Sequence, residues 1–262
     1  MPAKSTNRRK KPVSRDLIVS FLDRTLRTNE IKDYSVNGLQ VEGVEKVSRV
    51  GLAVDACMDT FRLAEENGCQ MLIAHHGIIW NGIQRVTGPV YRQLQFLIGK
   101  KLNLYASHLP LDLHPTLGNN ARIASMLKLR NVRPFGVYKG VTIGCEGTLT
   151  RAATIESISG VLKKELGSEI HSLPFGPEKI KRIAVISGGG SGELPEAVEK
   201  GIDLFITGES SHENHHAALE GSLNVIYCGH YHSEKPGVQA VGELLVEKFG
   251  LDTIFLDVPT LV

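Results

Sequence analysis

The sequence predicts an α/β fold of two pseudo-repeated domains with mostly parallel central sheets. Short apolar strands alternate with helical segments along most of the 262 residues, and this alternation is typical of parallel sheets. Hydrophobic residues make up 42% and charged residues 22%, as in ordinary globular proteins. In addition, AEENGCQMLIAHH at 64–76 resembles AVEKGIDLFITGE at 197–209, which indicates a duplicated unit.

Positive charge is concentrated at the N-terminus. Residues 1–15 contain six basic side chains and no acidic one, which leaves 24 basic and 28 acidic residues in the rest of the chain. We predict that residues 1–13 form a disordered basic tail. A body of net charge −4 is not typical of nucleic-acid-binding proteins, so association with nucleic acid is expected only weakly, through the tail.

Neither a membrane span nor an export signal is predicted. No apolar run reaches the roughly 18 residues of a membrane helix, and no apolar stretch follows the basic N-terminus. The four cysteines form no C-x-x-C pair, which disfavours a zinc ribbon or a redox pair. We therefore expect a cytoplasmic protein with reduced thiols and no membrane partner.

The first predicted α/β half covers residues 14–128. A helix is expected from Ser14, a candidate N-cap, through Leu26. Further along, apolar runs predict strands and periodic segments predict helices: strands at 50–54, 71–74 and 102–106, and helices at 59–67 and 89–99.

The remainder divides into a middle segment, 129–180, and a second α/β half, 181–262. The middle segment is less regular, with a strand at 141–149 and a helix at 154–166. In the second half strands and helices alternate again: strands at 183–187, 203–207, 224–228 and 253–257, and helices at 193–200, 210–220 and 237–248.

Three polar clusters follow predicted strands directly. His75 and His76 follow the strand at 71–74, and His108 and Asp112 follow the strand at 102–106. The strand at 224–228 is followed by His230, His232 and Glu234. The predicted repeat aligns His108 with His230 and Asp112 with Glu234. Because the carboxyl ends of parallel strands converge, these side chains are expected to meet there. Imidazole and carboxylate groups are ligands of zinc, iron and manganese, and one carboxylate can bridge two ions.

Each cluster alone also has a plainer interpretation. A His-x-x-x-acid pattern on a helix can be a simple contact between residues four apart. His212, His215 and His216 share one face of a predicted helix, where a polar surface is favoured over a second metal site. His212 and Glu209 are nevertheless expected near the cleft, Glu209 because it occupies the repeat position of His76.

Two further polar segments follow strands at the start of predicted helices. SGGGSGE at 187–193 lacks a complete phosphate-binding motif, so a tight turn is favoured. Asp55 is interpreted as a helix N-cap rather than a cleft residue.

The sequence resembles the Nif-three-like dinuclear metal-centre family, whose members are often called GTP cyclohydrolase 1 type 2 homologs. The matching motifs occur in family order over about residues 14–262: SVNGLQVEG, IAHHG, SHLPLDLHPTLGNN, TGESSHE and GHYHSE. The resemblance implies two interlinked α/β domains, a metal site at their interface and a toroidal homo-hexamer. Leu109, Pro110 and Glu213 depart from the usual pattern, and the middle segment is too short for the domain that some members insert there.

Two divalent metal ions per subunit are implied, such as zinc, manganese or iron. By motif, their ligands would be His75, His76, Asp112, His230 and Glu234, with Glu234 bridging. His108 and His212 match positions that line the same pocket. The expected function is a dinuclear metal-dependent hydrolase of a small polar substrate, a nucleotide or phosphoester, with proton-transfer candidates His108, His212 and His232. The alternative is a metal-binding hexameric scaffold or regulatory binding protein without catalysis.

Overall fold

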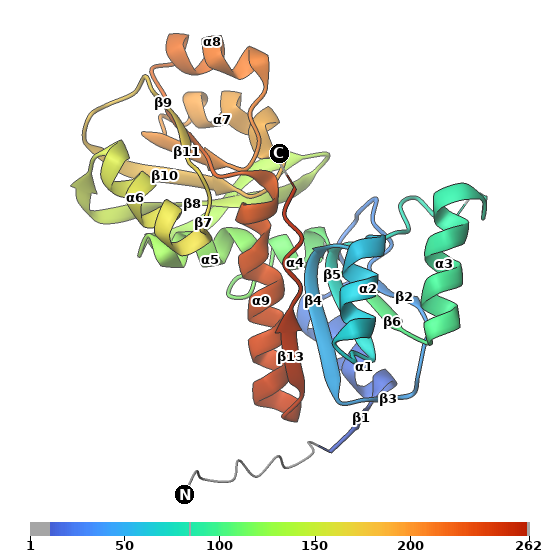
Figure 1. Ribbon diagram of the computed structural model, residues 1–262. Helices are drawn as coiled ribbons and strands as arrows, with labels where there is room; N and C mark the ends of the chain where they lie inside the picture. The colour runs from blue at the N-terminus through green and yellow to red at the C-terminus, as the bar shows by residue number, and fades with distance from the viewer. Residues whose placement is uncertain (1–10, 84, 261–262) are drawn as a thin grey trace, which may run out of the picture.

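The computed structural model describes residues 11–83 and 85–260, which contain two large β-sheets flanked by helices and one small two-stranded sheet (Figure 1). Residues 1–10 of the predicted tail lie outside the described residues. Val13, which the prediction assigns to the tail, belongs to β1 (Val13–Ser14) and pairs with Val47 of β3 (Lys46–Val47). Among the described residues, no helix has the length and hydropathy needed to cross a membrane.

The first sheet has five strands and is mostly parallel, as predicted. Three strands from the first half stand in its centre in chain order and parallel to one another. One edge strand, β2, pairs antiparallel with β6. The strand order is β13 (Asp252–Phe255), β4 (Arg49–Asp55), β5 (Met71–His76), β6 (Asn103–Ala106) and β2 (Gly38–Val41).

The second sheet has six strands, and here the prediction of a mostly parallel sheet is wrong. Only its three central strands are parallel neighbours. The middle segment adds a long antiparallel hairpin, joined by a tight turn, on one side and an antiparallel edge strand on the other. The strand order is β7 (Arg130–Tyr138), β8 (Val141–Ala153), β10 (Ile180–Ile186), β11 (Leu204–Thr207), β12 (Asn224–Tyr227) and β9 (His171–Pro174).

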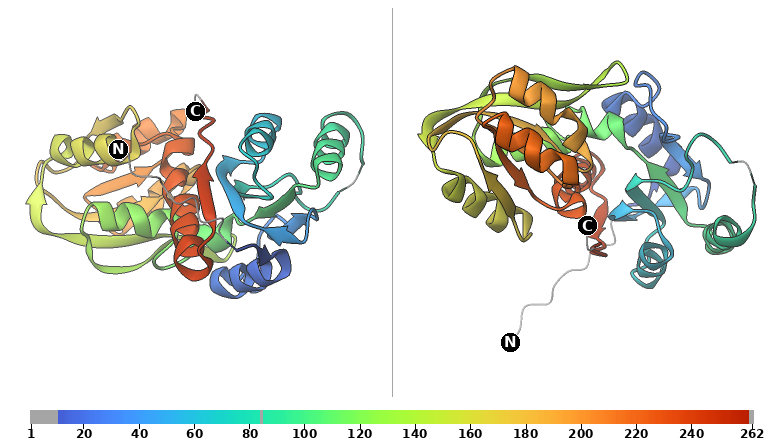
Figure 2. Two further views of the ribbon diagram at one scale, coloured as in Figure 1. Left: turned by 60° about the horizontal axis from the view of Figure 1, so that its bottom comes forward. Right: turned by 90° about the horizontal axis from the view of Figure 1, so that it is seen from above.

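The C-terminal segment returns to the first sheet. After β12 the chain forms α9 (His230–Phe249), which packs on β4 and β5, and then β13, which pairs in parallel with β4. Figures 1 and 2 show α9 between the two sheets, and β13 forms an edge of the first sheet. Sheet membership therefore does not follow the predicted halves, since a strand from 181–262 completes the sheet of 14–128. In addition, α9 begins seven residues before the predicted helix at 237–248, with Pro236 inside it.

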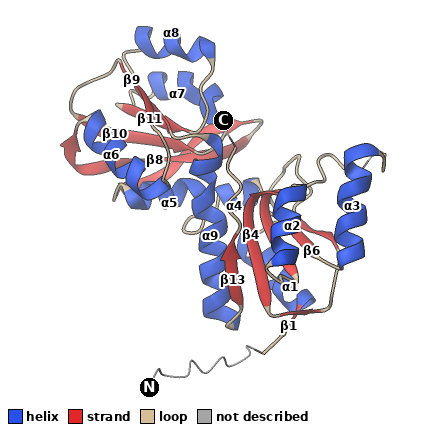
Figure 3. Cartoon of the chain, in the orientation of Figure 1, coloured by secondary structure: helices blue, strands red, loops and turns tan. Residues whose placement is uncertain are grey.

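Helices cover both faces of each sheet (Figure 3). In the first sheet, one apolar cluster joins α1 and α9 to β4 and β5, and a second joins α2 and α3 to the opposite face. In the second sheet, α5 and α6 cover one face, and α7 and α8 cover the other. The helices are α1 (Arg15–Leu26), α2 (Met58–Glu66), α3 (Gly88–Lys100), α4 (Leu109–Asp112), α5 (Asn119–Met126), α6 (Ile155–Leu166), α7 (Leu194–Glu199) and α8 (His212–Glu220), with a 3₁₀ turn at Gly190–Glu193.

Candidate metal centre

Five side chains that the sequence analysis proposed as metal ligands meet in the structure. His75 and His76 end β5, and Asp112 ends the short helix α4 that follows β6. His230 and Glu234 occupy the first two turns of α9, one helical turn apart, so they face the same side. Parallel strands thus bring residues from distant parts of the sequence to one place, as expected.

Glu234 lies at the centre of this group. Its Oε1 is 3.5 Å from Nε2 of His75, and its Oε2 is 3.3 Å from Nε2 of His76 and 3.1 Å from Nε2 of His230. On the Oε1 side, Asp112 Oδ2 is 3.4 Å from the same nitrogen of His75. The donor atoms therefore form two groups that share Glu234: one with His75 and Asp112, the other with His76 and His230.

The other ring nitrogen of each of these histidines is held by an acceptor. Nδ1 of His75 contacts the Ser107 carbonyl oxygen at 2.9 Å, and Nδ1 of His76 contacts Asp55 Oδ1 at 2.8 Å. Nδ1 of His230 contacts the Glu209 carboxylate. Because a carbonyl and a carboxylate only accept hydrogen bonds, each Nδ1 is the donor, and Nε2 of a neutral ring presents a lone pair to the centre.

The inner atoms fit a cation. His75 Nε2, His230 Nε2 and Glu234 Oε2 are buried and make no hydrogen bond within the described part of the chain. Lone pairs that face one another across 3.1 to 3.5 Å in a buried place are unfavourable without a positive charge between them. Two ligands each about 2.1 Å from a tetrahedral ion lie about 3.4 Å apart, so the observed spacing matches metal coordination.

The charges at the centre are strongly coupled to one another. Burial disfavours the charged form of His75, but Asp112 and Glu234 outweigh it and raise the pKa of His75 well above its usual value. For His230, Glu234 and Glu209 likewise outweigh burial and raise the pKa to about 9. Burial alone would raise the pKa of Glu234, which is 3% exposed, but the surrounding histidines hold that pKa well below its usual value. The site thus favours a carboxylate that is neutralised by positive charge.

His108 lies beside this centre, and sequence reasoning missed its partner. Its ring forms a third donor group with His75 and His76. Nδ1 of His108 is 3.0 Å from Asp33 Oδ1. Burial opposes ionisation of Asp33, but His108 and the Asn37 amide outweigh it and lower the pKa of Asp33 to about 2. Asp33 stands in a polar loop with no recognisable motif, so the sequence carried no signal for this contact.

The two other proton-transfer candidates lie in neighbouring pockets. His232 lines a pocket of about 580 Å³ with Glu209, and its Nδ1 is 3.4 Å from the Leu166 carbonyl oxygen. Burial and the nearby Lys235 lower the pKa of His232. His212 is exposed and lines a separate pocket of about 500 Å³ with His215 and His216. Within 11–83 and 85–260, no group of side chains that could hold a metal ion includes His212 or His232.

Three segments beside the predicted strands take up definite roles around the centre. Asp55 is not the N-cap of α2, because that position is Cys57; its carboxylate instead holds His76. Glu209 does reach the cleft, as the repeat alignment predicted. In the glycine-rich segment, Gly188 has φ +62°, and a Cβ there would lie 2.1 Å from Glu234 Oε1. Glycine at position 188 therefore allows the backbone to lie close to the Glu234 carboxylate.

Comparisons with known proteins agree with the motifs. A family model described as Duf34/NIF3 (NGG1p interacting factor 3) matches residues 13–260. A GTP cyclohydrolase 1 type 2 homolog of Archaeoglobus fulgidus is 46% identical over 243 residues, covering 93% of this chain and 97% of that protein. One from Pyrococcus abyssi is 45% identical over 249 residues, covering 95% and 99%. The crystal structure of TTHA1606 from Thermus thermophilus superposes with a TM-score of 0.88 at 39% identity, covering 95% of this chain and 100% of that one. The chain belongs to the DUF34/NIF3 family.

Proposed function

We propose that this protein is a dinuclear metal-dependent hydrolase of a small polar substrate, a nucleotide or another phosphoester. The observation that carries the proposal is the position of Glu234, whose two oxygens face different donor groups. One carboxylate shared by two such groups is an arrangement that holds a pair of divalent ions. Zinc, manganese and iron all accept imidazole and carboxylate ligands.

The proposed centre lies at an interface between two interlinked domains. The donors on β5 and α4 come from the first half of the chain, and those on α9 come from the second. The pairing of β13 with β4 supports the interlinking, because it returns the end of the chain to the first sheet. We also propose the homo-hexamer that the resemblance implies, which light scattering on the purified protein would test.

The cleft beside the centre can admit a substrate. A pocket of about 660 Å³ is lined by His76, His108, His230 and Trp80. Two bound ions would activate water and polarise the substrate. Asp33 keeps Nδ1 of His108 as a donor and leaves Nε2 free, so we propose that His108 accepts and returns a proton there. For His212 and His232, a role in proton transfer remains a prediction from the sequence. The name GTP cyclohydrolase 1 type 2 homolog, carried by the relatives, supports including nucleotides among the substrates to be tested.

Metal content tests the central part of the proposal. Inductively coupled plasma mass spectrometry on the purified chain should find about two ions per subunit, and Glu234→Gln should lose both. Glu247→Gln, an exposed position on the same helix, is the matched control and should keep them. Absence of metal from the wild type after reconstitution with zinc, manganese and iron would refute the proposal.

Turnover tests the hydrolase assignment separately. The metal-loaded protein would be assayed against nucleotides and phosphoesters, with Glu234→Gln as the inactive comparison. His108→Gln should keep the ions and lose activity, whereas loss of the ions would show that His108 is a ligand instead. Two bound ions without turnover on any substrate would favour the non-catalytic scaffold.

A further inference from the structure

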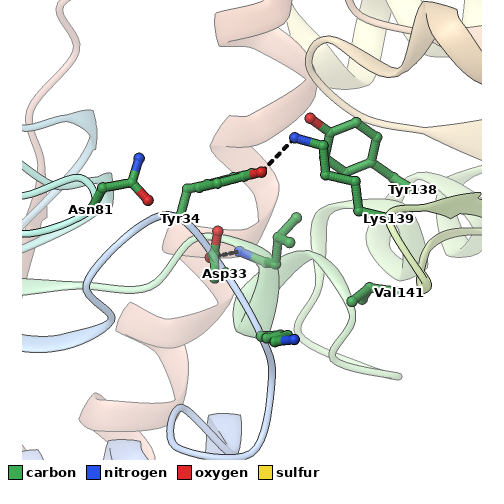
Figure 4. Close-up of a pocket in the computed structure, with 8 residues that line it drawn as sticks. Asp33, Tyr34, Asn81, Tyr138, Lys139 and Val141 are labelled. Carbon is green, nitrogen blue, oxygen red and sulfur yellow. Dashed lines mark hydrogen bonds between the residues drawn. The ribbon is translucent and has the colours of Figure 1, made fainter.

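A second pocket, of about 290 Å³, lies beside Asp33, whose carboxylate contacts the His108 ring (Figure 4). Four parts of the chain line it: the loop 32–34, Asn81, Leu109 of α4, and the β7–β8 hairpin with Tyr138 and Lys139. The first three belong to the part of the chain around the first sheet, and the hairpin belongs to the second sheet. The pocket therefore forms only when both parts of the chain are folded.

Lys139 places an ammonium group in this pocket without a carboxylate partner. Its Nζ donates a hydrogen bond to the Tyr34 hydroxyl at 2.5 Å and lies 4.3 Å from the centre of the Tyr34 ring and 5.1 Å from that of Tyr138. Figure 4 shows the ammonium group between the two phenols. Within the described residues, neither Lys139 nor Lys32, which also lines the pocket, forms an ion pair.

Asp33, the one acid among the described residues that line this pocket, does not pair with these lysines. The Asp33 side chain is only 2% exposed. Its oxygens accept hydrogen bonds from the His108 ring, from the Asn37 amide and from the backbone N–H groups of Ser35 and Leu109. These donors occupy the carboxylate, and two lysines outnumber it, so the lining residues carry an excess of positive charge. Two ammonium groups, a phenol and an amide are groups that bind a phosphate.

Neighbouring residues in the sequence connect this pocket with the metal-site cleft. Trp80 lines the cleft and Asn81 lines the second pocket, while His108 lines the cleft and Leu109 the second pocket. The Trp80 ring centre is 5.1 Å from that of His108. The two pockets therefore lie next to each other, on either side of residues 80–81 and 108–109.

We propose that the pocket of Lys32, Tyr34, Asn81, Tyr138 and Lys139 binds the phosphate of a phosphorylated substrate whose reacting part lies at the metal centre. The proposal rests on the function proposed above, and it narrows the substrate to one that carries a phosphate outside the reacting group. The Tyr34 and Tyr138 rings, both partly exposed, supply faces against which an aromatic base next to the phosphate can pack.

The turn geometry provides a clean variant for testing the proposal. Lys139 and Gly140 both have positive φ, 49° and 83°, in a two-residue turn that asparagine accepts readily as its first residue. Lys139→Asn therefore removes the ammonium without disturbing the hairpin. Lys128→Asn is the matched control, because Lys128 is also an exposed lysine with positive φ, 55°, and does not line the pocket.

Isothermal titration calorimetry with AMP, adenosine and inorganic phosphate on the full-length, metal-loaded chain measures the effect. We expect AMP to bind at least about tenfold more weakly to Lys139→Asn than to the wild type, and Lys128→Asn to bind as the wild type does. Adenosine, which has no phosphate, should bind weakly to all three proteins. Inorganic phosphate should follow the same order as AMP.

Glu234→Gln separates this proposal from that of the metal centre. If the phosphate lies in the second pocket, Glu234→Gln should still bind AMP, and Lys139→Asn introduced into it should abolish that binding. Loss of AMP binding in Glu234→Gln with no effect of Lys139→Asn would place the phosphate on the metals and overturn the proposal, as would equal binding by Lys139→Asn and Lys128→Asn. If the wild type binds no metal, the proposed metal centre is refuted. The comparison of AMP binding between Lys139→Asn and Lys128→Asn still tests the phosphate pocket in that case.

Discussion

Gly188→Ala is expected to separate metal binding from folding. The Cβ of alanine at this position would lie 2.1 Å from Glu234 Oε1 and 3.2 Å from His230 Nε2. Non-bonded contacts of carbon relax to about 3.5 Å, so the carboxylate oxygen must move by roughly 1.4 Å. Metal–ligand distances tolerate only about 0.2 Å, so Glu234 can no longer serve both donor groups.

The substitution also strains the backbone, and this part can be subtracted. An alanine in the left-handed region costs about 1–2 kcal/mol of unfolding free energy. Gly68 has nearly the same φ, +66°, and a Cβ there would meet nothing within 4 Å. Gly68→Ala therefore carries the same backbone strain without the contact to the metal-ligand cluster, and serves as the matched control.

The assay has two parts. Urea unfolding of the chelator-treated proteins should show similar losses of stability for both variants, about 1–2 kcal/mol. Metal titration against a competing chelator should show a loss of affinity of at least about tenfold for Gly188→Ala, and wild-type affinity for Gly68→Ala. Equal metal affinity in the two variants would refute the assignment of Glu234 as the shared ligand.

Three further predictions concern the residues that hold the centre and the first sheet. Asp55→Asn should weaken metal binding about 10- to 100-fold, because Asp55 orients His76, while the exposed Asp59→Asn should not; equal affinities by chelator competition would contradict this role. The pKa of Asp33 is lowered from 3.8 to about 2, so the ionised carboxylate stabilises the fold fully above about pH 4, and this stabilisation is lost as the pH falls through 2. Asp33→Asn should therefore lose less stability than the wild type between pH 4 and pH 2, and equal acid-unfolding curves would show that Asp33 makes no such contribution. Asn103→Leu should lower the free energy of unfolding by about 3 kcal/mol, because the buried Asn103 amide bonds to Gly43, Val44 and Gln70; a loss below about 1 kcal/mol in urea unfolding would show that water replaces these bonds.

Local sequence patterns located the elements and the inner residues of the site. The apolar runs that predict strands at 50–54, 71–74 and 102–106 correspond to β4, β5 and β6, because a strand buried on both faces must be continuously apolar. Polar residues that follow such runs lie near the carboxyl ends of the strands, where parallel strands converge. For this reason the sequence predicts that His75, Asp112 and Glu234 lie together, and folding buries all three.

Tertiary structure decided which strands share a sheet and what holds the histidines. The return of β13 to β4 depends on α9 packing across both regions, and no local pattern encodes a pairing between strands about 200 residues apart. Likewise, Asp33 and Asp55 resemble ordinary loop acids in the sequence. Their roles arise only because folding places each carboxylate within 3.0 Å of a ring nitrogen of His108 or His76. The sequence by itself indicated which side chains could hold metal ions, and the packing of distant segments decided how they are oriented, because a hydrogen bond depends on positions in space and not on spacing along the chain.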